Sequence, residues 1–349
     1  MPLSIDAPIA VTGATGYVAG HVVHELLSRG ACVHATARNP SDQAKVGHLL
    51  AMAQELPGTL KLFQADLLTE GAFEEAFRDC SIVIHTASPF LVGKQKDPQK
   101  TLVDPALKGT RNVLATVNQI ASVQRVVLTS SVIATYGDAI DCQKRGGVIH
   151  EGHWNESSSL EHQAYGLSKT LAEKEAWNIV REQTRWDLVT INPGFVMGPS
   201  LTARNDSASI DFLLGLISGK VPGMSEFWTA WVDVRDVAVA HVEAAFRTDA
   251  EGRHLLSAES ASIFDIIELL REHVSHPMKL PKLKTPKWMA YLFGPLVGFG
   301  WTEISRNVDI PVRVDNRRSI ERLGIEYRPL SDTLREHVDQ LVRDGLYVP

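Results

Sequence analysis

The segment TGATGYVAG, Thr12–Gly20, follows the apolar run Ile9–Thr12 and opens a helical pattern. Glycine is needed at Gly13 and Gly16, because the backbone must turn sharply there and approach a pyrophosphate closely. A helix that starts directly after such a turn offers free N–H groups and its positive dipole end to an anion. Ala19 stands where a third glycine is usual, and its methyl group is small enough for close helix packing. The segment therefore predicts a dinucleotide-binding turn.

Short apolar runs recur after this turn, with helical patterns between them. They cover residues 32–37, 60–64, 82–85, 126–130 and 188–192. This alternation is typical of βαβ units that form a parallel sheet with helices on both faces. We therefore expect an α/β fold of the Rossmann type, a doubly wound parallel sheet with a smaller C-terminal substrate-binding lobe.

The choice between NAD and NADP depends on the end of the second strand, which reads ATARNP. An NAD enzyme usually places an acid there for the ribose hydroxyls, whereas the 2′-phosphate of NADP needs a cation. Arg38 can contact a phosphate in a bidentate way, and Lys45 could add a second charge from the following helix. A solvated surface arginine is the alternative interpretation. We expect NADP(H), with Asp66 either at the adenine edge or acting as a helix cap.

The sequence YGLSK, Tyr165–Lys169, lies at the start of a predicted helix, so the phenol and the ammonium stand one turn apart on one face. An ordinary tyrosine, with a pKa of about 10, is a slow acid–base group at neutral pH, and a nearby ammonium lowers that pKa. Ser131, within the run TSSV that ends the fifth strand, lies at the carboxyl edge of the sheet, where it can hydrogen-bond a developing oxyanion. We expect Ser131, Tyr165 and Lys169 to be catalytic.

The domain assignment follows from where the alternation loosens. Residues 1–195 form the predicted NADP-binding Rossmann domain, and residues 231–258 return to it as a strand, a helix and a strand. Residues 196–349 otherwise form the substrate-binding lobe. The ligand cleft is expected beyond the carboxyl ends of the strands.

The composition is that of an ordinary globular protein, with 44% hydrophobic and 22% charged residues among 349. A net charge of -6 gives no electrostatic footprint for nucleic acid or an anionic membrane. Three dispersed cysteines argue against a disulfide scaffold or a metal site. The N-terminus does not read as a signal peptide, which favours a cytoplasmic address. We expect a monomer or homodimer that binds a small-molecule carbonyl substrate.

The most apolar stretch, residues 288–301, is too short to span a bilayer and is interrupted by three glycines and a proline. We expect it to be core or pocket wall, so no membrane partner is predicted.

The motifs together resemble the extended short-chain dehydrogenase/reductase superfamily, which includes the NAD-dependent epimerases and dehydratases. More narrowly, they resemble the group of dihydroflavonol reductases, cinnamoyl-CoA reductases and fungal or yeast aldehyde and ketone reductases. The similar blocks are TGATGYVAG, HTASP (85–89), KGTRNVL (108–114), TSSV (129–132), YGLSKTLAEKEAW (165–177), NPGFVMGP (192–199), WVDVRDVA (231–238) and VDNRRSIERLGIEYRPL (314–330).

The resemblance implies the catalytic roles of Ser131, Tyr165 and Lys169, with hydride passing from C4 of the nicotinamide to a carbonyl carbon while the tyrosine protonates the oxygen. It also implies the cofactor contacts, which we assign to Gly13, Thr15, Gly16, Tyr17, Val18, Arg38, Lys45, Asp66, Leu67, Thr86, Ala87, Ser88, Tyr165, Lys169, Pro193, Gly194 and Val196. No residue is assigned to a metal.

Departures from the group narrow the expected substrate. Flavonoid-reducing relatives carry Asn where Tyr136 aligns here, and cinnamoyl-CoA reductases carry NWYCYGK where this chain reads HQAYGLSK. We therefore expect neither a dihydroflavonol nor a CoA thioester, but a small hydrophobic aldehyde, ketone or keto ester. The candidate pocket residues are Phe90, Ile133, Tyr136, Phe195, Phe212, Phe227 and Trp231.

Three alternatives stay open at this point. A nucleotide-sugar epimerase or dehydratase shares the glycine turn, the serine and the YxxxK spacing, but would favour an acid where Arg38 stands. A hydroxysteroid dehydrogenase differs only in substrate. A non-catalytic NADP-sensing protein would need the turn but not the serine, tyrosine and lysine together.

Overall fold

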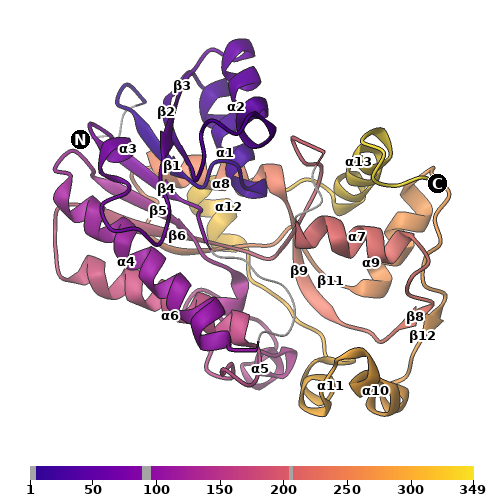
Figure 1. The fold of residues 1–349 in the computed structure, drawn as a ribbon. Helices are drawn as coiled ribbons and strands as arrows, with labels where there is room; N and C mark the ends of the chain where they lie inside the picture. Colours follow the sequence, from indigo (N-terminus) through magenta and orange to yellow (C-terminus); the bar gives the residue numbers. More distant parts are fainter. Residues whose placement is uncertain (1–4, 89–95, 204–206) are drawn as a thin grey trace.

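A seven-stranded parallel sheet forms the main body of the computed structural model, which describes residues 5–88, 96–203 and 207–349 (Figure 1). The strand order is β10-β6-β5-β4-β1-β2-β3. The strands β2 and β3 therefore lie on one side of β1, and β4 and the later strands lie on the other side. Open α/β sheets bind ligands at this change of order, between β1 and β4. The predicted fold class is confirmed. The strands are β1 (Ile9–Thr12), β2 (Cys32–Ala37), β3 (Thr59–Gln64), β4 (Ile82–His85), β5 (Arg125–Thr129), β6 (Asp187–Pro193) and β10 (Gly252–Leu256).

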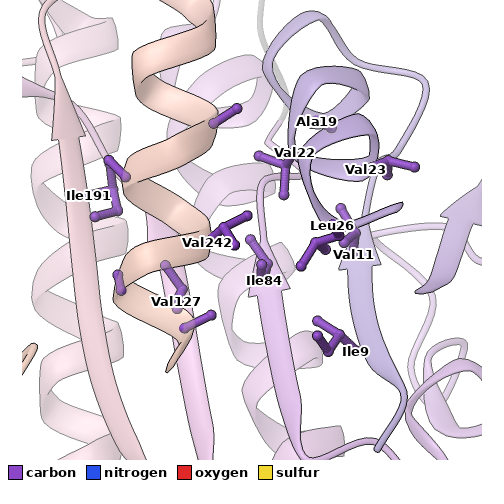
Figure 2. Close-up of a cluster of buried hydrophobic side chains, with 14 of the residues drawn as sticks. Ile9, Val11, Ala19, Val22, Val23, Leu26, Ile84, Val127, Ile191 and Val242 are labelled. Atoms are coloured by element: carbon purple, nitrogen blue, oxygen red, sulfur yellow. The ribbon is translucent and has the colours of Figure 1, made fainter. Parts of the chain in front are cut away.

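Helices cover both faces of this sheet because the inner strands are apolar on both sides. One face packs against α1 (Tyr17–Ser28), α2 (Gln43–Glu55) and α8 (Val234–Phe246). Figure 2 shows this core, where Val22 and Leu26 of α1 and Val242 of α8 meet side chains from the strands. The opposite face packs against α3 (Glu74–Phe77), α4 (Asp104–Gln119), which a π-helical turn (η1, Gln99–Val103) precedes, and α6 (Ala164–Arg181).

A smaller lobe is built on a three-stranded sheet of order β11-β9-β7. Its core joins the sheet to α7, α9 and α13. The elements of this lobe are β7 (Phe195–Met197), α7 (Ala208–Ile217), β8 (Gly223–Met224), β9 (Trp228–Asp233), β11 (Glu259–Ser262), α9 (Ile263–His273), β12 (Leu283–Lys284) and α13 (Leu330–Arg343). β8 and β12 pair as a separate two-stranded sheet.

The two lobes interleave in sequence more finely than predicted. Within residues 231–258, α8 and β10 lie with the main sheet, but β9 pairs with β7 and β11 in the smaller one. α12 (Arg317–Leu323), from the expected substrate lobe, packs against β10 and α8. The reason is local: Asp233 ends β9 and caps α8 by accepting a hydrogen bond from the Arg235 N–H, so the chain changes lobes at that residue.

The apolar stretch 288–301 departs from its prediction. It lies on α10 (Lys287–Phe293), a 3-10 turn (η3, Gly294–Val297) and α11 (Trp301–Asn307), and most of its large side chains are exposed to solvent rather than packed as core. The prediction was wrong because apolarity alone does not say whether a neighbour covers a segment. Within the described residues, every helix falls short of the length and apolarity that crossing a membrane requires.

Candidate active site

The carboxyl ends of β1 and β4 are tied together at the point where the strand order reverses. The Thr12 hydroxyl and Nδ1 of His85 lie 2.8 Å apart, and the Ala87 N–H donates to the same hydroxyl at 3.1 Å. On the other side, the Gly13 N–H donates to the Thr36 hydroxyl of β2 at 3.1 Å. Burial lowers the pKa of His85 to about 3, so this imidazole is neutral and structural. These contacts fix the turn after β1.

The turn itself has room for an anion only because it is built from glycine. Gly13 has a φ of +64°, and a Cβ there would lie 3.0 Å from the Cβ of Ala87. Gly16 donates to the Gly13 carbonyl at 2.9 Å and then precedes α1. Within the described residues, α1 has no side-chain cap and no acid in its first turn. The N–H groups that open α1 therefore suit a pyrophosphate.

The predicted cofactor residues beyond the turn lie at the neighbouring strand ends. Arg38 follows β2 and Lys45 is in the first turn of α2, and both side chains are exposed. Asp66 follows β3 and accepts a hydrogen bond from the Leu68 N–H at 2.8 Å. That bond closes a local turn, and α3 begins only at Glu74, so Asp66 is not a helix cap.

The remaining predicted cofactor residues come from the turn, from the start of α1 and from the segments that follow β3 and β4. Thr15 lies within the turn, and Val18 packs against the core from α1. The Tyr17 hydroxyl donates to the Gly198 carbonyl at 2.5 Å. Thr86 bonds the Thr12 carbonyl. Leu67 packs against Gly109 of α4, so closely that a Cβ on this glycine would lie 2.6 Å from Cγ of Leu67.

Residues 193–196 bring the backbone of the smaller lobe against the site. The Gly194 N–H donates to the Leu256 carbonyl at 2.9 Å. A Cβ on Gly194 would lie 2.5 Å from the Ala230 carbonyl oxygen, so only glycine fits. Pro193 ends β6 and Val196 lies in β7, on either side of this contact. The connection between the two sheets is therefore a close crossing of backbone segments.

Tyr165 and Lys169 lie one turn apart at the start of α6, as the spacing predicts. The ammonium Nζ of Lys169 is 5.9 Å from the centroid of the Tyr165 ring and donates to the Ser88 hydroxyl at 3.1 Å. Ser131 caps the 3-10 turn η2 (Val132–Ala134), which packs against α6, and its hydroxyl donates to the Pro193 carbonyl at 3.5 Å. The three predicted catalytic residues thus come from adjacent elements at one edge.

Desolvation dominates the protonation of this pair. Burial raises the pKa of the Tyr165 phenol and lowers the pKa of Lys169 to about 8. The direction for Tyr165 is opposite to the one expected from the spacing, because burial removes the water that would stabilise a phenolate. The nearby Glu173 carboxylate opposes the shift of Lys169 and favours the ammonium.

A buried ion pair stands directly behind Lys169, and sequence reasoning missed it. Glu173, one turn further along α6, is 2.6 Å from Nε of Arg253 on β10, and their side chains are 0% and 7% exposed. The guanidinium lies 3.9 Å from the centre of the Trp154 ring. The spacing of Glu173 from Lys169 was a visible signal, but nothing in the sequence pointed to Arg253.

The Glu173 carboxylate also accepts hydrogen bonds from uncharged side chains. The Ser130 hydroxyl donates to it at 2.5 Å and the Asn192 side-chain amide at 2.7 Å, while Asn192 donates to the Ser131 carbonyl as well at 3.1 Å. Together with Ser88 and Lys169, Ser130 and Glu173 line a small cavity. The carboxylate therefore links α6 to the strand ends that carry Ser131.

The predicted pocket residues divide into three groups. Phe195, Phe212 and Trp231 stack on one another with ring centroids 5.1 to 5.7 Å apart, and Trp231 is fully packed, with its indole N–H donating to the Ala261 carbonyl at 3.0 Å. Tyr136 is buried beside Ile133 in a separate cluster, and burial raises its pKa to about 12.

Phe227 directly precedes β9 in the smaller lobe. The Phe227 ring lies 5.9 Å from that of Phe299. Phe90 lies outside the described residues.

The sequence pattern of the NAD dependent epimerase/dehydratase family matches residues 9–256 of the chain. Among curated proteins, the chain is 39% identical to cinnamoyl-CoA reductase CAD2 of Medicago truncatula over 342 residues, which are 95% of each chain. It is 40% identical to tetraketide alpha-pyrone reductase 2 of Arabidopsis thaliana over 266 residues, covering 75% of this chain and 81% of that one.

Solved structures give a similar result. Gre2 from Candida albicans, solved in complex with NADPH, superposes with a TM-score of 0.77 at 28% identity and covers 97% of this chain and 99% of that one. Yeast methylglyoxal/isovaleraldehyde reductase Gre2, also complexed with NADPH, gives a TM-score of 0.77 at 26% identity, with 97% and 100% covered.

Proposed function

The chain belongs to the NAD dependent epimerase/dehydratase family, and from that premise we propose that it is an NADPH-dependent carbonyl reductase. The resemblance to extended short-chain reductases is confirmed by this membership, and the chain is a nicotinamide-dependent reductase of that type. The finer proposal is that it reduces a small hydrophobic aldehyde, ketone or keto ester. The observation that carries it is the convergence of Tyr165, Lys169 and Ser131 beside the glycine turn.

The roles of these residues follow from their chemistry. When bound, the cofactor supplies a hydride to the carbonyl carbon. The Tyr165 hydroxyl donates its proton to the carbonyl oxygen, since burial keeps the phenol protonated, and the Ser131 hydroxyl donates a hydrogen bond to the same oxygen. The Lys169 ammonium supports the phenolate that remains, and Glu173 favours its charged form.

Arg38 is proposed to select NADPH. Its exposed guanidinium follows β2 and can hold the 2′-phosphate through a charge-assisted bidentate contact. Such bonds contribute about 1.5–3 kcal/mol, so Arg38→Ala is expected to raise the KM for NADPH by about 10- to 100-fold and leave NADH kinetics nearly unchanged. Steady-state kinetics with both cofactors measure this.

The control for Arg38 is Arg78→Ala, an exposed arginine that precedes β4 at the opposite, amino edge of the sheet. It should leave both KM values unchanged. An unchanged NADPH preference in Arg38→Ala would place the phosphate on another cation, with Lys45 the next to test.

The pH dependence of kcat/KM should reflect the protonation of Lys169. Its ammonium is lost as the pH rises through about 8, whereas the phenol keeps its proton there. We expect kcat/KM for carbonyl reduction to fall about tenfold per pH unit above pH 8. Lys169→Met should lose most of the activity, and the activity that remains should no longer fall above pH 8. Lys100 is an exposed lysine on η1, and Lys100→Met should keep the fall above pH 8. If kcat/KM of Lys169→Met still falls above pH 8, another titrating group causes the fall.

The substrate class is tested by following NADPH and NADH oxidation with aromatic and aliphatic aldehydes, ketones and keto esters. Cinnamoyl-CoA belongs in the panel because one relative carries the name of a cinnamoyl-CoA reductase, although the residues before Tyr165 differ from that group. Steroid alcohols and nucleotide sugars test the other enzyme alternatives. Conversion of a sugar nucleotide without net NADPH oxidation would overturn the reductase proposal. A protein that binds NADPH but turns over no carbonyl would be the non-catalytic sensor.

A further inference from the structure

Asn192 lies fully buried near the carboxyl end of β6 and has no role in the reaction as proposed above. Its side-chain amide nitrogen donates to the Ser131 carbonyl at 3.1 Å and to the Glu173 carboxylate at 2.7 Å. Its amide oxygen accepts a hydrogen bond from the Thr190 hydroxyl at 3.0 Å. Both ends of the amide are therefore engaged, and one partner is the backbone of the residue that carries the proposed catalytic hydroxyl.

The orientation of this amide follows from the chemistry of its neighbours. A carboxylate and a peptide carbonyl only accept hydrogen bonds, so the atom of Asn192 that faces Glu173 and Ser131 has to be the nitrogen. The two hydrogens on that nitrogen match the two acceptors, and the Thr190 hydroxyl supplies a donor to the amide oxygen. Glu173 and Thr190 thus fix the direction in which Asn192 donates to the serine carbonyl.

The hydroxyl of Ser131 is held loosely by its own hydrogen bonds. It donates to the Pro193 carbonyl at 3.5 Å and accepts from the Ile133 N–H at 3.4 Å, and both distances are long for a hydrogen bond. A hydroxyl with such weak partners is able to turn towards the oxygen of a substrate. Its place in the site then depends on the backbone that carries it.

The backbone around Ser131 is fixed from β6 and α6. The Ser130 N–H donates to the Ile191 carbonyl at 2.7 Å, which continues the pairing of β5 with β6. The Ser130 hydroxyl donates to the Glu173 carboxylate at 2.5 Å. One residue further along, the side chain of Asn192 binds the Ser131 carbonyl beyond the last paired residues of the two strands.

We propose that Asn192 is a positioning residue for Ser131: its amide, oriented by Glu173, holds the Ser131 carbonyl and thereby places the serine hydroxyl for the oxygen of the substrate. This inference rests on the proposed function, in which Ser131 donates a hydrogen bond to that oxygen. Such a donor stabilises the transition state only at the right distance from the developing charge, and a displacement of about 1 Å can cost about 100-fold in rate.

The test is a double-mutant cycle on the full chain, with NADPH and benzaldehyde as the probe substrate. Ser131→Ala should lower kcat by about 100- to 1,000-fold, as the loss of one oxyanion donor does. Asn192→Leu should lower kcat by about 10- to 100-fold and leave the KM for NADPH unchanged. Added to Ser131→Ala, the same leucine should change kcat by less than about threefold, because the hydroxyl that Asn192 positions is already gone. Losses that multiply in the double variant overturn the proposal.

The matched control is Asn112→Leu. Asn112 of α4 is also buried, at 8% exposed, and its side-chain amide also donates to a backbone carbonyl, that of Leu67, at 3.0 Å. Any effect of Asn112→Leu on kcat should persist within about twofold when it is added to Ser131→Ala, as for independent sites.

Urea unfolding shows which variants are folded. If Asn192→Leu does not fold, Ser130→Ala takes its place in the cycle with the same expectation, because it removes one hydroxyl that anchors the same stretch of backbone.

The pH dependence separates the route through Ser131 from a route through Lys169. The fall of kcat/KM above pH 8 should begin at the same pH in Asn192→Leu as in the wild type. A shift would show that Asn192 acts through Glu173 on Lys169, and would overturn the proposal.

Hydrogen–deuterium exchange tests the geometry without turnover. The peptide that covers residues 129–134 should exchange faster in Asn192→Leu than in the wild type and should be unchanged in Asn112→Leu. Equal exchange in Asn192→Leu and the wild type overturns this proposal alone. A wild type that reduces no carbonyl, or a fully active Ser131→Ala, overturns the role proposed for the serine, and the positioning role of Asn192 fails with it.

Discussion

Tyr165→Phe is expected to lower kcat for carbonyl reduction by about a hundred- to ten-thousand-fold while NADPH still binds. The substitution removes one hydroxyl and its proton and leaves the ring on α6 in place. Stopped-flow or steady-state oxidation of NADPH gives the rate, and quenching of intrinsic fluorescence on titration with NADPH gives the affinity.

The control for this variant is Tyr347→Phe. The Tyr347 hydroxyl, like that of Tyr165, belongs to a phenol, but it donates to the Pro277 carbonyl at 2.7 Å on the far side of the smaller lobe. It should retain wild-type turnover. If Tyr165→Phe keeps more than about a tenth of the activity, another group protonates the substrate. If it loses NADPH binding as well, the residue has a structural role.

The largest effect on stability is expected from Arg253→Met. The substitution leaves the Glu173 carboxylate buried without its cation, and removing one partner of a buried ion pair costs about 3–5 kcal/mol. It also removes the guanidinium from the Trp154 ring. Urea unfolding monitored by circular dichroism measures the change in the free energy of unfolding.

A matched variant at an exposed arginine shows how much of this loss of stability depends on burial of the ion pair. Arg271→Met breaks the pair between Arg271 and Glu268, whose side chains are 50% and 57% exposed, and should cost about 0–1 kcal/mol. Adding Glu173→Leu to Arg253→Met should recover part of the loss, because no charge is then left buried. A cost below about 1 kcal/mol for Arg253→Met would mean that water reaches the carboxylate.

The sequence predicts the main sheet well because its strands are short, apolar and buried on both faces. The bounds of β1, β2 and β4 agree with the predicted runs, and the glycine turn lies where the strand order reverses. The positions of Tyr165 and Lys169 on one face of α6 follow directly from helical spacing. These features depend on local pattern alone.

Features that depend on distant partners were not predictable in this way. Arg253 and Glu173 are 80 positions apart, and each alone reads as a surface charge. β9 continues into a helix of the main body but pairs with the smaller sheet, because its partners β7 and β11 lie there. The stretch 288–301 reads as core by composition, although nothing among the described residues covers most of its large side chains.

The interleaving of the lobes bears on how the protein is made. During synthesis, β6 (residues 187–193) leaves the ribosome well before β10 (residues 252–256), the strand that pairs with the outer edge of β6. Until then the growing chain exposes an unpaired strand edge, and buried Arg125 lacks the Ala244 carbonyl that it bonds at 3.0 Å. Co-translational folding of the nucleotide-binding half alone therefore stops short of a closed sheet. Nascent chains that end near residue 195 should be the ones that chaperones retain and that aggregate when chaperones are scarce.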